Sequence, residues 1–372
     1  MLGVHKILER DEEKDMAKLK LAVIGQGRSG RDIHGAFYKS DKNDIFDVAV
    51  VVEADARRRE RALAEYPGCE VVESYQELFG REDIDLVVNA SFSKMHYSIT
   101  KDLLLHKFNV LVEKPFAANY YECADLIKTA EDNGVVLTVF QQTFLAPFYQ
   151  FAKELIASGK LGEIKQASIR YNNFSRRWDW QTLQCEMAGG IYNTGPHPIG
   201  LAVDLLDYSE DTRVAYSKLG CALTSGDSDD YAKIILTAPG KPVVDVEVSN
   251  IDAFSDYNLK LQGTKGTFKC TLTTYKMKYI VEGENPERPV IRGFLQNEEG
   301  YPLYCSEKLI THEEEGTFNG TAFDVGTESI YRMLYKTLTE GAPLTVKPEH
   351  VAKIISVIET VHAQNPLPLK FL

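Results

Sequence analysis

The feature that most constrains the fold of this chain is a short apolar segment that ends in three glycines. Residues 19–24, LKLAVI, have the composition of a buried strand, and Gly25, Gly27 and Gly30 follow it directly. Beyond Gly30 the apolar residues recur at helical spacing. A strand, a glycine turn and a helix in this order begin a βαβ unit, whose parallel strands need helical connections.

The same alternation of strand and helix continues along the first part of the chain. Each of the following segments begins with an apolar run of β character and then turns helical: residues 46–66, 69–79, 84–107 and 109–134, before a last strand within 135–144. This pattern predicts an α/β fold, a Rossmann-type domain on a doubly wound parallel sheet over residues 18–145. Residues 1–17 are assigned to an N-terminal extension without a function, with Met16 as a candidate start.

From about Tyr149 the pattern changes. A predicted helix over 148–159 is followed by segments of β character, several in direct succession: residues 163–174, 230–238, 243–251, 257–272 and 275–283. Strands that follow one another directly pair antiparallel. A final amphipathic helix is expected over Pro348–Gln364. The sequence therefore predicts a second, α+β domain over residues 146–372, built on a mostly antiparallel open sheet for substrate binding and oligomerisation.

Composition excludes several classes of partner. The formal net charge of −12 argues against nucleic acid, whose phosphates require a basic surface. No apolar stretch is long enough to span a bilayer and the N-terminus is too charged for a signal peptide, so we expect no membrane partner. The six cysteines are scattered without zinc-site spacing, which predicts free thiols, no metal site and a cytoplasmic location.

The glycines also predict a ligand. Gly25-Gln26-Gly27-Arg28-Ser29-Gly30 matches G-x-G-x-x-G between a strand and a helix, the arrangement that holds a dinucleotide pyrophosphate on the helix N-terminus. Glu53 ends the next strand. An acid at this position binds the adenosine ribose and repels a 2′-phosphate, so NAD is favoured over NADP.

Basic residues near this site leave two questions open. Arg57 and Arg58 keep NADP as a minority alternative, because a nearby arginine can accommodate its additional phosphate. Arg31 and His34 lie on the first predicted helix, where they face either the pyrophosphate or solvent.

Two further motifs supply candidate catalytic residues. VEKP, residues 112–115, closes another strand of the predicted sheet, and ligands bind at the carboxyl ends of such strands. This position makes Lys114 a functional candidate. GGIYNTGPH, residues 189–197, places His197 directly before an apolar helical segment. A histidine has a pKa near neutral pH and is suited to proton transfer.

From about Lys18 onward the chain resembles the Gfo/Idh/MocA family of nicotinamide-dependent sugar and polyol oxidoreductases. The motifs of this resemblance occur in the family's order and spacing: GQGRSG at 25–30, EKP at 113–115, SGKLGEI at 158–164, GGIYNTGPH at 189–197 and GTKGT at 263–267. The resemblance implies that Lys114 and His197 are the catalytic pair and face the nicotinamide between the domains.

The resemblance has further implications for ligands and partners. It assigns Glu113 and His96 to the cofactor side of the site, with His96 holding the loop around the nicotinamide. It also implies that the free face of the second sheet pairs with another subunit, which gives a homodimer or homotetramer.

Two positions depart from the family pattern. Asn193 lies four residues before His197, where polyol dehydrogenases of the family carry Asp, and an amide can orient substrate but cannot titrate. Thr143 replaces an arginine that reaches substrate in many relatives. We assign both residues to substrate binding, and the loss of the arginine argues against a strongly anionic substrate.

A segment before the histidine motif is expected to line the substrate pocket. Aromatic faces stack on sugar rings while charged groups bind hydroxyls. The alternative is that the two tryptophans fill the core. The candidate residues are Arg176, Arg177, Trp178, Asp179 and Trp180.

Together these motifs predict an NAD-dependent oxidoreductase that acts on a small carbohydrate. We expect hydride removal from a secondary hydroxyl of a sugar, glycoside or polyol, with His197 as general base and acid and Lys114 polarising the substrate oxygen. The replacement of the family's Asp and Arg by Asn193 and Thr143 favours a pyranose or its glycoside over free inositol as the substrate. Two alternatives remain: an NAD-dependent glycosidase that acts by transient oxidation and elimination, and a catalytically silent sugar or NAD sensor.

Overall fold

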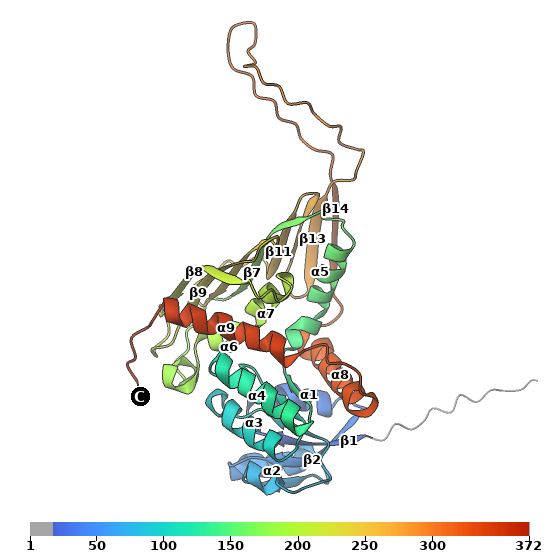
Figure 1. The fold of residues 1–372 in the computed structure, drawn as a ribbon, viewed down its shortest axis with the longest axis vertical. Coiled ribbons are helices and arrows are strands. Elements are labelled where there is room, and N and C mark those ends of the chain that lie inside the picture. The colour runs from blue at the N-terminus through green and yellow to red at the C-terminus, as the bar shows by residue number, and fades with distance from the viewer. Residues whose placement is uncertain (1–17, 372) are drawn as a thin grey trace, which may run out of the picture.

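The computed structural model describes residues 18–371, and the predicted extension of residues 1–17 lies outside them. Two sheets lie along the long axis of the molecule, each with helices packed against it (Figure 1). The first sheet is built by the first part of the chain and the second sheet by the remainder. No helix within residues 18–371 is long and apolar enough to cross a membrane.

The first sheet is six-stranded and fully parallel, in the order β3-β2-β1-β4-β5-β6. The order reverses between β1 and β4, and ligands bind outside the carboxyl ends of the strands at such a reversal. The predicted doubly wound sheet is confirmed. Its strands are β1 (Leu19–Ile24), β2 (Phe46–Val52), β3 (Glu70–Val72), β4 (Leu86–Asn89), β5 (Val110–Val112) and β6 (Leu137–Val139).

Helices connect these strands, as parallel pairing requires. The first begins as a π-helical turn, Arg28–His34, and continues as α1 (Gly35–Tyr38). Asp55 caps the next helix by accepting a hydrogen bond from the backbone of Arg58. After β3 only a 3-10 turn forms, Tyr75–Leu78. The longer helices are α2 (Ala56–Glu65), α3 (His96–Leu105) and α4 (Tyr120–Asn133).

The second sheet has eight strands in the order β14-β13-β12-β11-β7-β10-β9-β8. Every neighbouring pair is antiparallel except β7 with β10. The predicted mostly antiparallel open sheet is confirmed. The strands are β7 (Ile164–Asn172), β8 (Arg213–Gly220), β9 (Tyr231–Thr237), β10 (Val243–Ser249), β11 (Leu259–Gly263), β12 (Gly266–Cys270), β13 (Thr274–Tyr279) and β14 (His312–Thr317).

The two edge strands of this sheet, β8 and β14, have no clear signal in the sequence. β14 reads HEEEGT and buries none of its side chains, while β8 buries only Leu219. Charged side chains on edge strands discourage pairing with other chains. The same charges remove the apolar alternation from which strands are predicted.

Helices cover one face of the second sheet (Figure 1). On α5 (Pro147–Ala157), the ring of Phe151 lies 5.9 Å from that of Phe268 and 4.6 Å from that of Tyr275. The other helices of this layer are α7 (Pro196–Leu205) and α9 (Pro348–Gln364), the latter with the predicted bounds. The opposite face of the sheet carries no helix among the described residues.

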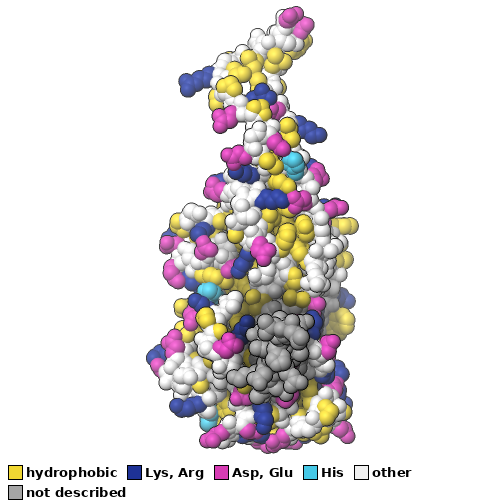
Figure 2. Space-filling view, turned by 90° about the vertical axis from the view of Figure 1, so that its right-hand side faces the viewer, with side chains coloured by type: hydrophobic (Ala, Val, Ile, Leu, Met, Phe, Trp, Pro, Cys, Tyr) yellow, Lys and Arg dark blue, Asp and Glu magenta, His cyan; other side chains and the backbone are white. Residues whose placement is uncertain are grey.

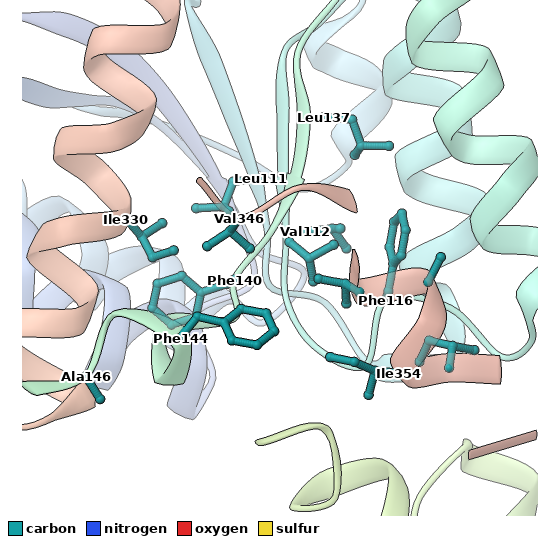
Figure 3. Packing of buried hydrophobic residues seen from close by; sticks show 14 of the residues in the cluster. Leu111, Val112, Phe116, Leu137, Phe140, Phe144, Ala146, Ile330, Val346 and Ile354 are labelled. Carbon is teal, nitrogen blue, oxygen red and sulfur yellow. The ribbon is translucent and has the colours of Figure 1, made fainter. Parts of the chain in front are cut away.

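The end of the chain returns to the first domain. On α8 (Thr327–Glu340), the ring of Tyr331 stacks on that of Phe37 at 4.8 Å. Figure 3 shows Ile330 and Val346 in the same core as Phe140 of the first domain. The predicted boundary between residues 145 and 146 separates the two domains along the sequence. The hydrophobic core, however, contains side chains from both sides of this boundary.

Residues 281–311 join β13 to β14 as a long arm. The arm projects away from the rest of the molecule (Figure 1), and its surface carries many hydrophobic side chains between the charged ones (Figure 2). The sequence analysis does not predict this projection.

Candidate active site

The three glycines of the first turn have different surroundings. Gly25 has a φ of +92°, and a Cβ there would lie 2.6 Å from the carbonyl oxygen of Ala90. A Cβ on Gly30 would lie 1.9 Å from the carbonyl oxygen of Gly25. A Cβ on Gly27, by contrast, would meet nothing within 4 Å. The first and third glycines thus permit close packing, and the second leaves open space for a diphosphate to approach the backbone.

The residues between these glycines lie at the start of the first helix. Gln26 is 2% exposed, so any contact with a cofactor involves its backbone. Arg28 and Ser29 are the first residues of the π-helical turn, where backbone N–H groups have no helical partner. The turn therefore fits the pyrophosphate of a dinucleotide.

Glu53 lies just after β2, where the sequence predicts the ribose acid. One carboxylate oxygen accepts a hydrogen bond from the backbone of Gln26 at 2.8 Å and the other from the backbone of Asp55 at 3.0 Å. The guanidinium of Arg58 lies 3.5 Å from the same side chain, while Arg57 is exposed and pairs with Asp55. Glu53 is thus held beside the glycine turn, with one arginine close to it.

Lys114 lies just after β5 and extends toward the histidine motif. Its Nζ donates a hydrogen bond of 2.8 Å to the carbonyl oxygen of Asn193 and lies 3.5 Å from the side-chain oxygen of the same residue. Burial lowers the pKa of Lys114; the charge of Glu113 opposes this effect, and the charges of Arg28 and Arg177 add to it.

The histidine motif folds into two short helices at a sharp junction. The first is α6 (Gly190–Asn193), and α7 begins at Pro196 as its first residue. A Cβ on Gly195 would lie 2.2 Å from the carbonyl oxygen of Ile191, so the junction requires glycine. Proline suits the first position of a helix because its missing N–H is not needed there. The helix α7 begins at Pro196, directly after Gly195, and His197 lies in its first turn.

One of the two ring nitrogens of His197 has a hydrogen-bond partner. Its Nδ1 lies 2.6 Å from the hydroxyl of Thr143, and its ring stacks on Tyr171 with centroids 6.1 Å apart. Within residues 18–371 no hydrogen-bond partner occupies Nε2. Burial, and then the positive charge of Lys114, lower the pKa of His197 to about 3. The ring is therefore neutral at physiological pH and can accept a proton at Nε2.

Thr143 has a different contact from the one expected. It is 2% exposed, and its hydroxyl bonds to His197, so it orients the histidine. Direct substrate contact, predicted from the position of an arginine in relatives, is disfavoured by this burial.

The segment of residues 176–180 has varied surroundings. Trp178 is 77% exposed, whereas Trp180 packs edge-on against Phe92 of the first domain with centroids 5.2 Å apart. Arg177 pairs with Asp179 at 2.6 Å. Neither tryptophan is fully buried. That these residues line a substrate pocket stays a prediction.

The predicted cofactor-side residue His96 joins two loops. It is 1% exposed, with Nδ1 2.7 Å from the carbonyl oxygen of Pro115 and Nε2 3.2 Å from that of Ser91. Burial lowers its pKa. His96 thus connects the loop after β4 to the end of β5, in agreement with a loop-holding function.

Glu113 is part of a buried chain of hydrogen bonds. One carboxylate oxygen lies 3.1 Å from Nε2 of His34, and the other accepts from the backbone of Lys114 at 3.0 Å. Burial raises the pKa of Glu113, but the hydrogen bond to His34 and nearby positive charges outweigh this, and the pKa is lowered. Glu113 is only 3% exposed, and its assignment to the cofactor side stays a prediction.

His34 is a residue whose function the sequence analysis misses. It is fully buried, so neither predicted environment, pyrophosphate or solvent, is correct. Its Nδ1 lies 2.7 Å from the hydroxyl of Tyr331, which also bonds to that of Tyr38. His34 and Tyr331 are 297 positions apart, and no local pattern links them. Arg31 instead forms a partly exposed ion pair with Glu65.

The other titratable residues form no further cluster of this kind. Across residues 18–371 no group of three or more His, Cys, Asp or Glu side chains is arranged to hold a metal ion.

Family comparisons agree with this geometry. The model described as "Oxidoreductase family, NAD-binding Rossmann fold" matches residues 19–141, and the "GFO/IDH/MocA C-terminal domain" matches residues 149–269. The chain belongs to the Gfo/Idh/MocA oxidoreductase family. Membership makes the first domain an NAD(P)-binding Rossmann domain.

Relatives within the family have several activities. An uncharacterized oxidoreductase of Schizosaccharomyces pombe is 29% identical and covers 94% of this chain and 97% of its own. The scyllo-inositol 2-dehydrogenase (NADP(+)) IolW of Bacillus subtilis is 22% identical over 92% of each chain. A 2,7-anhydro-N-acetylneuraminate hydratase of Mediterraneibacter gnavus is 22% identical over 68% of this chain and 67% of its own.

Solved structures of other proteins share this fold. An NAD-binding protein from Listeria innocua superposes with a TM-score of 0.76 at 18% identity, covering 94% of this chain and 98% of that one. This likeness extends over both domains.

Proposed function

We propose that this chain is an NAD-dependent oxidoreductase that oxidises a secondary hydroxyl of a sugar, glycoside or polyol. The observation that carries this proposal is the bond from Nζ of Lys114, just after β5, to the carbonyl oxygen of Asn193, four residues before His197, whose Nε2 has no hydrogen-bond partner among the described residues. The inositol dehydrogenase among the relatives supports a hydroxyl as the reacting group.

The two catalytic side chains divide the proton chemistry between them. A bound nicotinamide would supply the hydride acceptor. Nε2 of His197 accepts the hydroxyl proton if Nδ1 carries the ring hydrogen and donates a hydrogen bond to the hydroxyl of Thr143. The Lys114 ammonium donates a hydrogen bond to the same substrate oxygen and stabilises its developing negative charge. In the reverse direction His197 returns the proton.

The cofactor preference follows from Glu53. Its carboxylate lies beside the glycine turn, where it can bind ribose hydroxyls and repel a 2′-phosphate. Arg58, 3.5 Å away, and the NADP(+)-dependent relative support NADP as the competing cofactor. Titrating each dinucleotide by calorimetry tests this preference, and tighter binding of NADP would contradict it.

The substrate class follows from the segment of residues 176–180. The positive charge of Arg177 lowers the pKa of Lys114, and the exposed ring of Trp178 offers an apolar surface next to Arg177 in the chain. A pyranose or glycoside has hydroxyls that can bind the charged side chain and an apolar face that can stack on the aromatic ring. The free cysteines support the cytoplasm as the place of reaction.

The decisive experiment incubates the protein with NAD or NADP and a panel of polyols, sugars and glycosides. Absorbance of reduced cofactor and the mass of every product are followed together. Loss of two hydrogens from a substrate with matching reduced cofactor supports the proposal. Substrate turnover without any oxidised product, even transiently, would contradict it.

A second candidate function follows from the relative that is a hydratase. A hydratase carries out no net oxidation, so the same residues would support transient oxidation followed by addition or elimination, as in an NAD-dependent glycosidase. This candidate predicts a product of changed connectivity with no accumulation of reduced cofactor. A catalytically silent sensor is disfavoured because Lys114 and His197 are both present and Lys114 is hydrogen-bonded to Asn193 of the histidine motif.

A further inference from the structure

The loop between β8 and β9, residues 221–230, ends in a run of buried polar side chains. Asp227, Ser228, Asp229 and Asp230 are each 2% exposed, although they lie in a loop. Burial of a carboxylate is costly unless hydrogen bonds satisfy its oxygens. The bonds made by these side chains therefore identify the parts of the fold that the loop supports.

Asp227 joins this loop to the segment that follows residues 176–180. Its Oδ1 accepts a hydrogen bond from the backbone of Gln184 at 2.9 Å, and the Gln184 side chain donates to the Asp227 carbonyl oxygen at 2.9 Å. Its Oδ2 accepts from the backbone of Lys370 at 2.8 Å and of Phe371 at 3.2 Å. Burial raises the pKa of Asp227, but these backbone hydrogen bonds outweigh it, and the pKa is lowered. Asp227 is thus a carboxylate that uses both oxygens.

Further bonds of the same loop reach the candidate substrate residues. The backbone of Asp227 donates to the carbonyl oxygen of Thr182 at 3.0 Å, and the backbone of Ser225 donates to that of Arg177 at 3.2 Å. The hydroxyl of Thr182 in turn donates to the carbonyl oxygen of Asp179 at 2.7 Å. The loop therefore holds this segment at several points along its length.

The segment also contacts the first domain. Trp180 packs edge-on against Phe92, and Glu186 forms an ion pair with Lys94 at 2.7 Å. Phe92 and Lys94 follow β4, at the carboxyl edge of the parallel sheet where ligands bind. A displacement of the segment would therefore move the candidate substrate residues relative to this edge.

Asp229 joins the same loop to the histidine motif. Its Oδ2 accepts a hydrogen bond from the backbone of Ile191 at 2.8 Å, and its carbonyl oxygen accepts from the backbone of Gly190 at 2.7 Å. A Cβ on Gly189, whose φ is +113°, would lie 2.4 Å from Oδ1 of Asp229, and one on Gly190 would lie 3.1 Å from Oδ2. The two glycines that open the motif thus let Asp229 approach α6 closely.

The residues that Asp229 anchors lead directly to the catalytic contact. The helix α6 contains four residues, Gly190–Asn193, and its last residue accepts the hydrogen bond from Lys114. Fixing the start of α6 therefore fixes the carbonyl oxygen that holds the Lys114 ammonium. Because α7 begins three residues after Asn193, the same anchor supports the start of the helix that carries His197.

We propose that Asp227 and Asp229 are positioning residues that hold two separate parts of the site. Asp227 holds the candidate substrate segment, and Asp229 holds the histidine motif. This inference rests on the proposed function, because it assigns supporting residues to the same site. Since the two side chains are equally buried and lie two positions apart, a general loss of stability would affect both variants alike.

The first test compares the steady-state kinetics of two alanine variants with the first oxidised substrate. Asp227→Ala should raise KM about 10-fold, within the cost of a lost buried hydrogen bond, and leave kcat nearly unchanged. Asp229→Ala should lower kcat by about 10- to 100-fold with little change in KM, because Lys114 and His197 lose their alignment. The control is Asp102→Ala on α3, which removes the acceptor of the Tyr75 hydroxyl and should change neither constant.

The asparagine variants sharpen this distinction. Within residues 18–371, Oδ1 of Asp229 has no hydrogen-bond partner, and burial raises the pKa of Asp229 to about 7, so a neutral side chain with one acceptor oxygen is tolerated. Asp229→Asn should therefore recover most of the wild-type kcat. Because Asp227 uses both oxygens and an amide nitrogen cannot accept, Asp227→Asn should behave like Asp227→Ala.

A second test requires no substrate. The two tryptophans of the chain, Trp178 and Trp180, both lie in the candidate substrate segment, so tryptophan emission reports on this segment alone. Asp227→Asn should shift the emission to longer wavelength and increase its quenching by acrylamide, because Trp180 separates from Phe92. Asp229→Asn and Asp102→Ala should leave the emission unchanged. In Asp229→Ala, hydrogen exchange should instead accelerate in peptides that cover residues 189–195.

The outcomes distinguish this inference from the proposed function. If the wild-type protein oxidises no substrate of the panel, the proposed function fails, while emission and hydrogen exchange still test the two positioning residues. Circular dichroism shows whether each variant is folded, and a serine variant, whose hydroxyl is too short to reach the same partners, replaces an alanine variant that is not. Equal changes of kcat and KM in both variants, wild-type kinetics in both, or emission unchanged by Asp227→Asn would each overturn the inference.

Discussion

The regions around His34 and His197 each hold a histidine by hydrogen bonds, but they satisfy its ring nitrogens differently. His34 is fully buried, with Nδ1 bonded to Tyr331 and Nε2 to Glu113. His197 has Nδ1 bonded to Thr143 and no partner at Nε2. A histidine with both nitrogens bonded holds structure together, whereas one with a free nitrogen is available for chemistry.

The partners of the two histidines also come from different parts of the chain. Tyr331 on α8 brings the end of the chain to the first domain, so His34 connects two distant segments. Thr143 and His197 come from the segments that lead into and through the second domain. The difference teaches that burial alone does not identify a structural histidine; the contacts of each nitrogen do.

The largest expected effect follows from His197→Ala. Removal of the general base should lower kcat/KM by about 10²- to 10⁴-fold while dinucleotide affinity is unchanged. Steady-state rates with the first oxidised substrate and calorimetric titration measure both quantities. His106→Ala, an exposed histidine after α3, is the control. Turnover at the wild-type rate would remove His197 from the mechanism.

A slightly smaller loss is expected from Lys114→Met, about 10²- to 10³-fold in kcat, by analogy with the removal of an oxyanion donor. The pH profile sharpens this prediction. Because burial lowers the pKa of Lys114, the ammonium is lost below the usual pH of about 10.5, and wild-type kcat/KM should fall on the alkaline side. Lys114→Arg should abolish this alkaline decline; its persistence would assign the decline to another group.

For His34→Leu we expect a loss of stability instead of the loss of catalytic rate expected for His197→Ala. This change removes the hydrogen-bond partner of one buried carboxylate oxygen of Glu113, so the free energy of unfolding should fall by about 1–3 kcal/mol. Urea denaturation measures the loss, and His34→Gln should recover part of it. Residual kcat in the folded variant should exceed that of His197→Ala. If His34→Leu abolishes turnover without loss of stability, the distinction between the two histidines fails.

Thr143→Val should have a moderate effect on the rate. The change keeps the shape of the side chain and removes the hydroxyl that orients His197, so kcat should fall about 10-fold, within the cost of a lost buried hydrogen bond. KM should change little if Thr143 acts through His197, and Thr143→Ser should restore the rate. A rise in KM with unchanged kcat would instead support the direct substrate contact that the sequence predicts.

The last prediction concerns acid stability instead of rate. The folded-state pKa of His197, about 3, lies below its unfolded value of about 6.5, so the unfolded chain binds more protons between these pH values. Stability therefore falls as the pH decreases through this window, by at most about 1.4 kcal/mol per pH unit from this group. His197→Phe should flatten the decline of the melting temperature between pH 6.5 and 4. An unchanged slope would show that His197 remains protonated in the folded state.

Short-range patterns were sufficient for much of this protein. The glycine turn, the alternation of strands and helices, Lys114, His197 and the bend at Gly195 all follow from residues close together in the sequence, because backbone conformation and hydrophobic periodicity are local properties. The family resemblance added the pairing of Lys114 with His197.

Other features depend on contacts between distant segments. The bonds from His34 to Tyr331 and from Thr143 to His197 join residues 297 and 54 positions apart, and no local pattern encodes them. The sequence also does not predict the arm or the two edge strands, β8 and β14, because their side chains do not alternate between core and solvent. Hydrogen-bond partners and exposed surfaces are properties of the assembled fold, so the assignment of each histidine had to come from the three-dimensional arrangement.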